Sequence, residues 1–515
     1  MKPPFSRTLP SLLDEQALLN GDTIAVISNV QQHSYSQLAT RTQQLAASLR
    51  ANGIRRGDRV GVLLSNRIEW LEICFGALAA GAVVVPISTW SKPAELEFIL
   101  NDADVHTLFA AATIGKEGFA AILHKIRPQL PQLQTLVILG EASTDLGGVH
   151  YEDLFSSAPI DLPPGDGPSA TDDALILYTS GSTSKPKAVC LAHYGLIENG
   201  FNIGERMALS SDDRVFASVP LFWAYGSANA LPATFSHGAT LVLQERFEAG
   251  EALSLIERHK CTAIYTLPGM TTALIQHDDF TPMRTKSLRT GLTIGSPQDV
   301  MNAASVLGAR DICNIYGSSE TYGNCCVTPS EWPLARRAAC QGPPLPGVSL
   351  RLVDGEIQVH GYLMRGYGGQ SAVHNADVFT TDGWYCTGDS GQLTDDSDIV
   401  FLGRNSEMIK RAGINVSPAE VEDVLMQHPS VFEAGVVGTP DSTKGETIFA
   451  FVVAAKGTSE ADLIAHCRAL SSTYKVPDRI EFRDILPATA TGKLLRQALK
   501  DDAAALGQKD VSHAA

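Results

Sequence analysis

The stretch Tyr178-Thr179-Ser180-Gly181-Ser182-Thr183-Ser184-Lys185-Pro186-Lys187-Ala188-Val189 decides how the rest of the chain is interpreted. An apolar run at 174–178 leads into it and predicts a short buried strand. The small and hydroxylated residues that follow offer backbone N–H groups and hydroxyl donors to a polyphosphate, and the lysines offer a mobile ammonium. The standard phosphate-loop spacing does not fit, because no second glycine precedes either lysine. By itself the stretch could also be a surface loop.

Length and charge limit the classes of protein to which the chain can belong. Its 515 residues exceed what one hydrophobic core normally organises, so two or more domains are expected. A hydrophobic content of 44% is that of a soluble globular protein. The formal net charge of −16 opposes non-specific binding to nucleic acid or to an anionic membrane surface. An anionic ligand must therefore be held by local cations and backbone N–H groups.

The N-terminal segment and the cysteines indicate a cytoplasmic protein. Residues 1–7 lack the apolar core of a signal peptide, and no apolar run reaches the length of a membrane span. The nine cysteines form no C-x-x-C pair, and the vicinal Cys325 and Cys326 suit neither a disulfide framework nor a zinc site. We therefore expect reduced, buried cysteines, no membrane span and no nucleic-acid partner.

The order of predicted elements indicates an α/β fold for the larger, N-terminal part. An amphipathic helix is predicted over 35–54, followed by a strand at 58–64 and a buried helix that passes into a strand within 76–86. Further apolar strands are predicted at 105–111, 135–139, 215–219, 239–243 and 262–267. Such alternation is typical of a parallel sheet with both faces covered.

The C-terminal part has a different pattern. Residues 346–401 predict short alternating strands with frequent glycine, as in a small β-barrel-like subdomain. Beyond them, a compact α+β unit is predicted from strands and a helix at 432–437, 448–454, 461–470 and 479–483. Ser417-Pro418-Ala419-Glu420 predicts a helix start with a capping box. We place the boundary within 403–408, which gives domains 1–404 and 405–515.

The segment Ile315-Tyr316-Gly317-Ser318-Ser319-Glu320-Thr321 follows another apolar run and carries candidate nucleotide ligands. Tyr316 offers a ring on which a base can stack, and Thr321 offers a hydroxyl to a phosphate. Glu320 offers the hard oxygen that Mg²⁺ prefers. The alternative is an ordinary turn with an exposed carboxylate.

Three further residues have chemistry suited to the same ligand. Asp389 follows a glycine turn and could accept a ribose diol, the alternative being an Asx-turn. Arg404 could contact ribose or phosphate, or form a surface salt bridge. Lys493 stands in a Thr/Gly turn that opens a helix, where most lysines are simply solvated.

Taken together, these segments resemble the adenylate-forming superfamily of acyl-CoA synthetases, firefly-type luciferases and peptide-synthetase adenylation domains. The resemblance spans about the whole chain, and its motifs occur in the family's order. They are Gly81-Ala82…Pro86, 178–189, Pro220–Gly226, Tyr316–Thr321, Gly355–Gly361, Thr387-Gly388-Asp389, 403–422 and Gly492-Lys493.

The resemblance implies a large N-terminal domain of stacked α/β sheets, the β-barrel-like subdomain and a small, mobile α+β C-terminal domain. It implies ATP, Mg²⁺ and coenzyme A as cofactors. A carboxylic acid attacks the α-phosphate to give an acyl-adenylate and pyrophosphate. The C-terminal domain then rotates about a hinge at Ser406, and a thiol displaces AMP. The expected enzyme is an acyl-CoA ligase, for which a homodimer is also conceivable.

The resemblance also assigns roles to individual residues. The catalytic residues it implies are Lys493, Glu320 (which also binds Mg²⁺), Thr183 and Lys410. Those implied for ATP or AMP are Thr179, Ser180, Gly181, Ser182, Thr183, Lys187, Gly295, Ser296, Pro297, Tyr316, Gly317, Ser318, Thr321, Asp389, Phe401 and Arg404. Those implied for the acyl pocket are Trp223, Tyr225, Ala228, Gly295, Tyr322 and Gly323. Gly413 and Asn415 are implied on the coenzyme A side.

The chain departs from the family pattern at four positions. Ser184 and Ala188 stand where glycine is usual, and added side chains there could hinder the loop from closing on phosphates. Ser406 replaces the usual Asp or Lys of the hinge, and Trp223 replaces a frequent His. One alternative is therefore an enzyme that mainly catalyses thioester formation from a supplied acyl-adenylate.

The motif after Pro220 bears on the substrate. Peptide-synthetase domains hold the substrate amine with an Asp there, whereas Phe222-Trp223-Ala224-Tyr225 contains no acid. A hydrophobic, aromatic, alicyclic or fatty carboxylic acid is therefore favoured over a free amino acid, although Trp223 could equally be core packing. The same motifs would also suit an adenylating enzyme that loads a carrier protein, or a binding protein without turnover.

Overall fold

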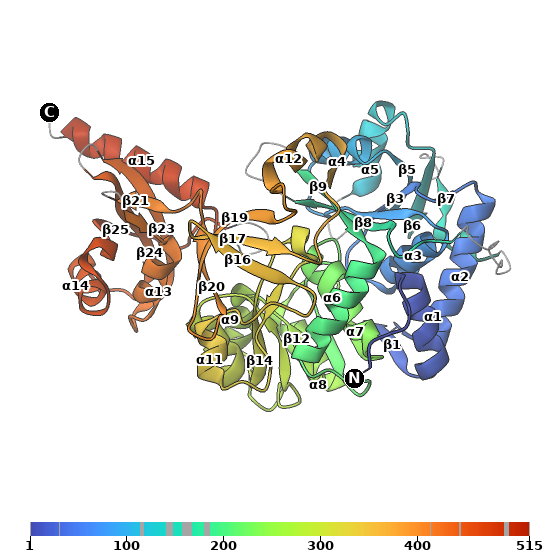
Figure 1. Cartoon of the computed structure of the whole chain (residues 1–515), viewed down its shortest axis with the longest axis horizontal. Coiled ribbons are helices and arrows are strands. Elements are labelled where there is room, and N and C mark those ends of the chain that lie inside the picture. The colour runs from blue at the N-terminus through green and yellow to red at the C-terminus, as the bar shows by residue number, and fades with distance from the viewer. Residues whose placement is uncertain are drawn as a thin grey trace. The chain divides into compact units, whose positions relative to one another are not determined.

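The computed structural model describes residues 2–29, 31–113, 118–140, 148–156, 167–179, 186–411, 414–441, 444–488 and 494–513, without the side chains of 156, 415 and 507–513 (Figure 1). The chain divides into two compact units. The first comprises 1–350 and 359–385, and the second comprises 351–358 and 386–515.

The first unit contains two eight-stranded sheets. Their strands are β1 (Ile24–Ser28), β2 (Gln31–Ser34), β3 (Arg59–Leu63), β4 (Val83–Pro86), β5 (Val105–Ala111), β6 (Thr135–Leu139), β7 (Val149–His150), β8 (Asp173–Thr179), β9 (Lys187–Ala192), β10 (Arg214–Ala217), β11 (Thr240–Leu243), β12 (Ala263–Tyr265), β13 (Thr290–Thr293), β14 (Asp311–Tyr316), β15 (Cys326–Val327) and β18 (Tyr367–Gly368). One sheet has the order β15-β14-β13-β12-β10-β11-β1-β2, the other β18-β9-β8-β4-β3-β5-β6-β7. The antiparallel pairs are β1–β2, β8–β9, β9–β18 and β14–β15.

Helices connect the strands, and α3 lies between the two sheets. They are α1 (Leu9–Asn20), α2 (Tyr35–Ala51), α3 (Ile68–Ala79), α4 (Pro93–Asp102), α5 (Phe119–Ile126), α6 (His193–Arg206), α7 (Leu231–Ser236), α8 (Ala249–His259), α9 (Pro268–Gln276), α10 (Pro297–Met301), α11 (Leu334–Ala339) and α12 (Asn375–Val378). Helix α3 contacts β1 of one sheet and β3 and β4 of the other. Because both its sides are covered, α3 is apolar nearly all round.

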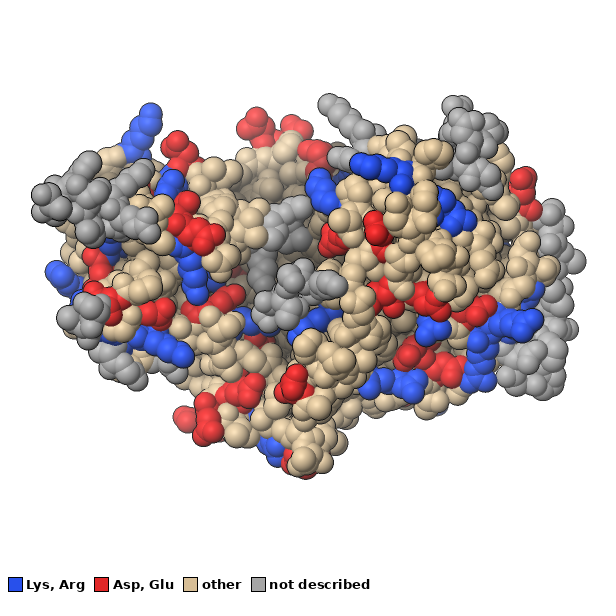
Figure 2. Space-filling model, turned by 90° about the horizontal axis from the view of Figure 1, so that it is seen from above, with Lys and Arg blue, Asp and Glu red and all other residues tan. Residues whose placement is uncertain are grey.

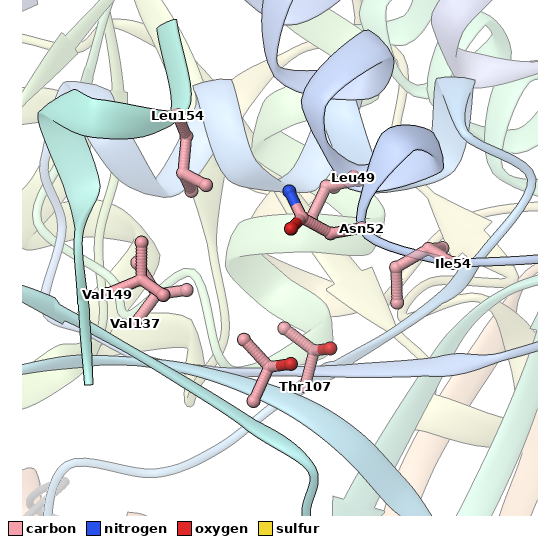
Figure 3. Close-up of a pocket in the computed structure, with 8 residues that line it drawn as sticks. Leu49, Asn52, Ile54, Thr107, Val137, Val149 and Leu154 are labelled. Carbon is pink, nitrogen blue, oxygen red and sulfur yellow. The ribbon is translucent and has the colours of Figure 1, made fainter. Parts of the chain in front are cut away.

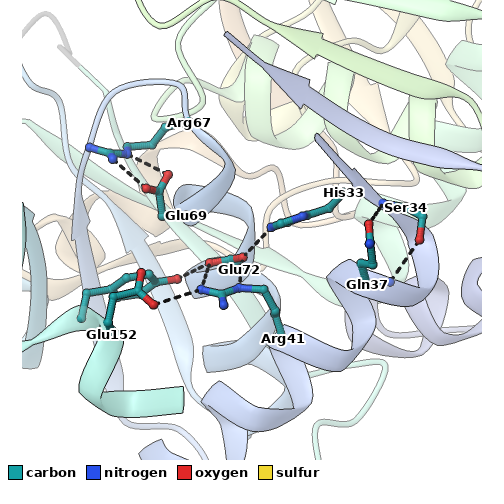
Figure 4. A network of polar contacts seen from close by, with 9 residues as sticks. His33, Ser34, Gln37, Arg41, Arg67, Glu69, Glu72 and Glu152 are labelled. Carbon is teal, nitrogen blue, oxygen red and sulfur yellow. Dashed lines mark hydrogen bonds and ion pairs between the residues drawn. The ribbon is translucent and has the colours of Figure 1, made fainter. Parts of the chain in front are cut away.

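One carboxylate lies in this apolar layer. Glu72 of α3 is 1% exposed and accepts hydrogen bonds from Arg41, from His33 Nε2 at 3.1 Å and from Tyr151 Oη at 2.5 Å (Figure 4). The partners come from α2, β2 and the short helix η3 (Tyr151–Ser156). Burial opposes the charged form of Glu72, but these hydrogen bonds outweigh it and lower its pKa.

The second unit includes most of a four-stranded sheet and all of a five-stranded one. The first sheet comprises β16 (Ser349–Val353), β17 (Glu356–His360), β19 (Tyr385–Leu393) and β20 (Ile399–Arg404) in that order. The other comprises β21 (Ile409–Arg411), β22 (Ile414–Val416), β23 (Val431–Asp441), β24 (Gly445–Ala454) and β25 (Arg479–Phe482). The helices are α13 (Pro418–Met426), α14 (Glu460–Leu470) and α15 (Arg496–His513).

Alternation along β24 explains why helices cover both faces of the five-stranded sheet. Ile448, Ala450 and Val452 pack with residues of α13 and α14. Phe449 and Phe451 point the other way and pack with α15.

The sequence predicts most of these elements, with three differences. The apolar strands form two sheets, in agreement with the stacked α/β sheets that the resemblance implies, whereas the alternation of elements alone predicted one parallel sheet. The predicted strand 262–267 is shorter and covers only β12. At α13, the Ser417 hydroxyl accepts from the Glu420 N–H as predicted, whereas the Glu420 carboxylate pairs with Lys475 Nζ at 3.0 Å.

Candidate active site

Two strands, β8 and β9, flank the central residues of the predicted phosphate-binding stretch. Strands β8 and β9 pair antiparallel, and Thr179 lies opposite Lys187 where the strands part. Ser180, Gly181, Ser182 and Thr183, which we predicted to bind phosphates, lie outside the described residues, as do Ser184 and Lys185. The buried strand before the loop is confirmed.

The segment after β18 supports these two strands from the side. Ser371 Oγ accepts from the Ala188 N–H at 3.1 Å and donates to the Gly368 carbonyl at 2.7 Å. Tyr178 Oη donates to Asp102 Oδ2 at 2.7 Å, and Asp102 Oδ1 accepts from the Gln370 N–H of the same segment at 2.8 Å. These contacts hold the ends of β8 and β9 that flank the predicted phosphate-binding residues.

The predicted base and metal residues follow β14. Tyr316 ends the strand and is 7% exposed, with Gly317 so close to the backbone of Gly323 that a side chain has no room. The Thr321 hydroxyl accepts from the Ser318 N–H at 3.0 Å and donates to the Ser318 carbonyl at 3.1 Å. That hydroxyl therefore shapes the turn from Ser318 to Thr321, and its role toward phosphate stays a prediction.

Glu320 and Lys187 both contact Tyr367. The Tyr367 Oη donates to Glu320 Oε1 at 2.9 Å, and Lys187 Nζ lies 5.1 Å from the centre of the Tyr367 ring. The structure thus brings a predicted metal ligand and a predicted phosphate ligand to one side chain. The sequence analysis missed Tyr367, since nothing in the glycine-rich segment 366–369 distinguishes it from a packing residue.

Gly295, Ser296 and Pro297 form the start of α10. The Ser296 hydroxyl donates to Asp299 Oδ2 at 2.8 Å, and the Ser296 N–H donates to the same oxygen at 2.9 Å. Gly295 has φ +152° and lies against this carboxylate, where a Cβ would come within 2.5 Å of Asp299 Oδ2. Desolvation by burial outweighs the hydrogen bonds and raises the pKa of Asp299.

Four of the six residues predicted for the acyl pocket, Tyr225, Ala228, Tyr322 and Gly323, come from the π-helix η4 (Tyr225–Ala230) and the turn at 322–323. Asn229 Nδ2 joins the two by donating to the Tyr322 carbonyl at 3.3 Å. Ala228 is fully buried, and the Tyr225 hydroxyl donates to the Thr266 carbonyl at 3.3 Å.

Two of these residues, Tyr322 and Gly323, contact other parts of the protein closely. The Tyr322 ring is buried against Gly195, and its hydroxyl accepts from the Ala192 N–H at 3.0 Å. Gly323 has φ +89°, and a Cβ there would collide with the Asn229 amide. Both support the neighbouring backbone, and their role toward an acyl group stays a prediction.

Trp223 belongs to an aromatic cluster. Its ring lies 5.2 Å from Trp90 and 6.1 Å from Phe222, both nearly perpendicular. Trp90, which the sequence analysis did not single out, remains 41% exposed. The cluster thus combines an apolar surface with partial access to solvent.

In the second unit, Asp389 and Arg404 lie directly opposite each other on β19 and β20. Arg404 Nε is 3.0 Å from Asp389 Oδ1, and Asp389 is 4% exposed. Phe401 lies on β20 opposite Gly391. The two predicted ribose ligands, Asp389 and Arg404, therefore form an ion pair.

The remaining predicted residues lie along or beyond the segment 405–408, which joins the four-stranded to the five-stranded sheet. Ser406 lies in this segment and is exposed. Lys410 is exposed on β21, opposite Asn415 in β22. Gly413 and Lys493 lie outside the described residues, as does the side chain of Asn415.

Comparison with known proteins identifies the family. Residues 13–370 match the AMP-binding enzyme family, and residues 420–493 match the AMP-binding enzyme C-terminal domain. The chain belongs to the AMP-binding enzyme family.

Similar members of the family are ligases that form CoA thioesters. A feruloyl-CoA synthase of Amycolatopsis sp is 32% identical, over 90% of this chain and 92% of its own. The anthranilate CoA ligase AuaEII, solved with anthranoyl-AMP, has a TM-score of 0.88 and 28% identity over 99% of this chain and 100% of its own. The o-succinylbenzoate CoA synthetase MenE of Bacillus subtilis, solved with ATP and magnesium ion, has a TM-score of 0.78 and 27% identity over 95% and 99%.

This AMP-binding enzyme is an acid–thiol ligase of the AMP-forming type. It forms an acyl-adenylate from a carboxylic acid and ATP, and then transfers the acyl group to coenzyme A with release of AMP. ATP, Mg²⁺ and coenzyme A take part. The predicted superfamily, fold class and enzyme type are confirmed.

The residues present suit Mg²⁺. Glu320 offers a carboxylate whose Oε1 is held by Tyr367. Among the described residues, no group of three or more His, Cys, Asp or Glu side chains could hold a metal. One carboxylate together with substrate phosphates is a usual Mg²⁺ environment, whereas an all-protein cage is not.

On the face in Figure 2, Lys and Arg side chains are interspersed with Asp and Glu, and no large basic patch forms. No helix in the described part is long and apolar enough to cross a membrane. A mostly apolar cavity in the first unit contains no predicted site residue (Figure 3). It is lined by Leu49, Asn52, Ile54, Thr107, Thr135, Val137, Val149 and Leu154.

Proposed function

We propose that the enzyme activates a hydrophobic carboxylic acid, with Lys187, Glu320, Asp389, Arg404 and Lys493 as its principal ATP ligands. The ATP site is inferred mainly from two contacts of Tyr367, one with Glu320 and one with Lys187 at the start of β9. A carboxylate and a triphosphate repel each other, so positive charge and N–H donors are needed around the α-phosphate. When bound at Glu320, Mg²⁺ would supply part of that charge.

The bonds made and broken define what these residues must do. A carboxylate oxygen forms a bond to the α-phosphorus, and the bond to the pyrophosphate oxygen breaks. Lys493 would stabilise negative charge developing on the α-phosphate, while Lys187 and the loop N–H groups would hold the leaving pyrophosphate. Asp389 and Arg404 would hold the ribose, and Tyr316 would stack on adenine.

For the second half-reaction, the C-terminal domain 405–515 would rotate about Ser406 and present Lys410, Gly413 and Asn415 to the thiol substrate. The thiol sulfur then bonds to the acyl carbon, and the bond to AMP breaks. The change of sheet at 405–408 supports a hinge there.

The acid class rests on the aromatic cluster of Trp90, Phe222 and Trp223. The segment 220–226 contains no carboxylate that could hold a substrate amine. An aromatic, alicyclic or fatty acid therefore suits the site better than an amino acid.

A panel of acids incubated with enzyme, ATP, Mg²⁺ and coenzyme A tests the proposal, with AMP release and thioester mass as readouts. We expect an aromatic or aliphatic acid to give both products and amino acids to give neither. Activation of amino acids alone would contradict the proposed acid class. Replacing coenzyme A with a holo carrier protein tests the acceptor, because both present the same thiol arm.

Two further features are also proposals. We place the enzyme in the cytoplasm because no disulfide joins its nine cysteines, all of which lie in the described part of the chain. A homodimer stays a prediction, to be measured by light scattering.

A further inference from the structure

Tyr367 is held rigidly between three segments of the first unit. It is 6% exposed, and β18 pairs with β9 so that Tyr367 lies opposite Val189. Its N–H donates to Asn375 Oδ1 at 2.7 Å, and its carbonyl accepts from Asn375 Nδ2 at 3.0 Å. The backbone that carries the Tyr367 ring is thus anchored through both of its polar groups.

The hydroxyl group of Tyr367 contacts Glu320. Its hydroxyl donates to Oε1 at 2.9 Å, and the Glu320 carbonyl accepts from the Met364 N–H at 2.7 Å. The carboxylate is therefore fixed through both its main chain and its side chain. This hydrogen bond engages Oε1, and the second oxygen of a carboxylate can serve as a ligand for a hard cation.

The face of the same ring contacts Lys187. Its Nζ lies 5.1 Å from the ring centre, within the range of a cation–π interaction. Because Lys187 and Val189 belong to the same short strand, the β9–β18 register places ring and ammonium together. One buried side chain thus contacts both an anion and a cation of the ATP site.

We propose that Tyr367 is a positioning residue, which orients the Glu320 carboxylate for Mg²⁺ and holds the Lys187 ammonium for the phosphates. This inference rests on the proposed function, since it takes Glu320 as the metal ligand. Partners that orient a metal ligand commonly change metal affinity when they are removed. A tyrosine that only fills space would not have this effect.

Two substitutions separate the contributions of hydroxyl and ring. Tyr367→Phe keeps the ring and removes the donor, whereas Tyr367→Leu removes both. Tyr151→Phe is the matched control, because Tyr151 also donates to a carboxylate, that of Glu72, within the same unit but among other elements. Melting curves of the three variants show whether the fold is kept.

ATP binding to the full-length enzyme, measured by calorimetry over a range of Mg²⁺ without acid or coenzyme A, is the readout. We expect Tyr367→Phe to raise the half-saturating Mg²⁺ concentration on the order of 10-fold, with Mg²⁺-free ATP binding unchanged. Tyr367→Leu should also weaken Mg²⁺-free ATP binding by about threefold, since the ammonium loses the ring. Tyr151→Phe should match the wild type.

Glu320→Gln separates failure of this inference from failure of the proposed function. If Glu320→Gln raises the half-saturating Mg²⁺ and Tyr367→Phe does not, Tyr367 is no positioning residue while Glu320 remains the metal ligand. If Glu320→Gln has no effect, the proposed metal site itself is wrong. A shift in Tyr151→Phe equal to that in Tyr367→Phe would also overturn the inference.

Discussion

Ala188 faces Gly368 across the antiparallel pair of β9 and β18. Ala188 is 1% exposed, and a Cβ built on Gly368 would lie 3.9 Å from that of Ala188 and 3.0 Å from Cys190 Sγ. The alanine that replaces a usual glycine of the phosphate-binding stretch is thus buried within the sheet, and the glycine opposite leaves room for Cys190 Sγ.

We therefore expect Ala188→Gly to leave adenylation nearly unchanged. The methyl group is packed inside the sheet, so its removal should change ATP–pyrophosphate exchange by less than about twofold while destabilising the strand by about 0.5–1 kcal/mol. Exchange assays with an accepted acid and melting curves measure the two effects. A many-fold gain in exchange would show that Ala188 does impede the loop.

The sequence predicts elements whose signal is local. The helix α2 has its apolar face at helical spacing, and β5 and β6 match the predicted apolar runs residue for residue. Motifs such as 316–321 could be found because family resemblance marks them. Their exact contacts could not, since Thr321 turns back to Ser318 only in the folded turn.

Tyr367 and Trp90 could not be found in this way. The role of Tyr367 depends on the register between β18 and β9, which are far apart in the chain. Trp90 lies in an ordinary loop and meets Trp223 only through the fold. Pairing across such distances has no period or spacing that a single sequence displays.

The buried Glu72 should make the stability of the first unit depend on pH. Its pKa in the folded state is below the ordinary value of 4.5, because hydrogen bonds from His33, Arg41 and Tyr151 outweigh burial. The charged carboxylate therefore contributes stability above pH 4.5, and this contribution is lost as pH falls through the lowered pKa.

Glu72→Gln should accordingly lower the apparent free energy of unfolding by about 3 kcal/mol at neutral pH, since it leaves Arg41 without its buried partner. The difference from the wild type should shrink below pH 4.5. Urea denaturation across this pH range measures it. Glu152→Gln is the control, because Glu152 is 76% exposed and 3.7 Å from Arg41. A difference that does not vary with pH would contradict the assignment.

Asp389→Asn should weaken nucleotide binding through the ribose. The amide cannot pair with Arg404 as the carboxylate does, and it is a weaker acceptor for the ribose hydroxyls. We expect the Kd for AMP to rise on the order of 10-fold. Calorimetry with AMP measures this rise, and Asp395→Asn, at an exposed turn of the same unit, is the control.

The dideoxyribose analogue of AMP makes this test specific. It lacks the diol, so Asp389→Asn should weaken its binding much less than that of AMP. Equal losses for both ligands would place Asp389 away from the ribose.

Lys493→Ala should separate the two half-reactions. If the ammonium stabilises charge on the α-phosphate, its removal slows adenylation by about 10²–10³-fold, as expected for loss of one preorganised donor. Thioester formation from preformed acyl-adenylate should continue, because that step forms no bond to phosphorus. Pyrophosphate exchange and single-turnover thioester assays measure the two steps, and Lys456→Ala, an exposed lysine of the same unit, is the control. If Lys493→Ala exchanges pyrophosphate at the wild-type rate, this lysine takes no part in adenylation. Equal losses in both steps would indicate a general loss of structure.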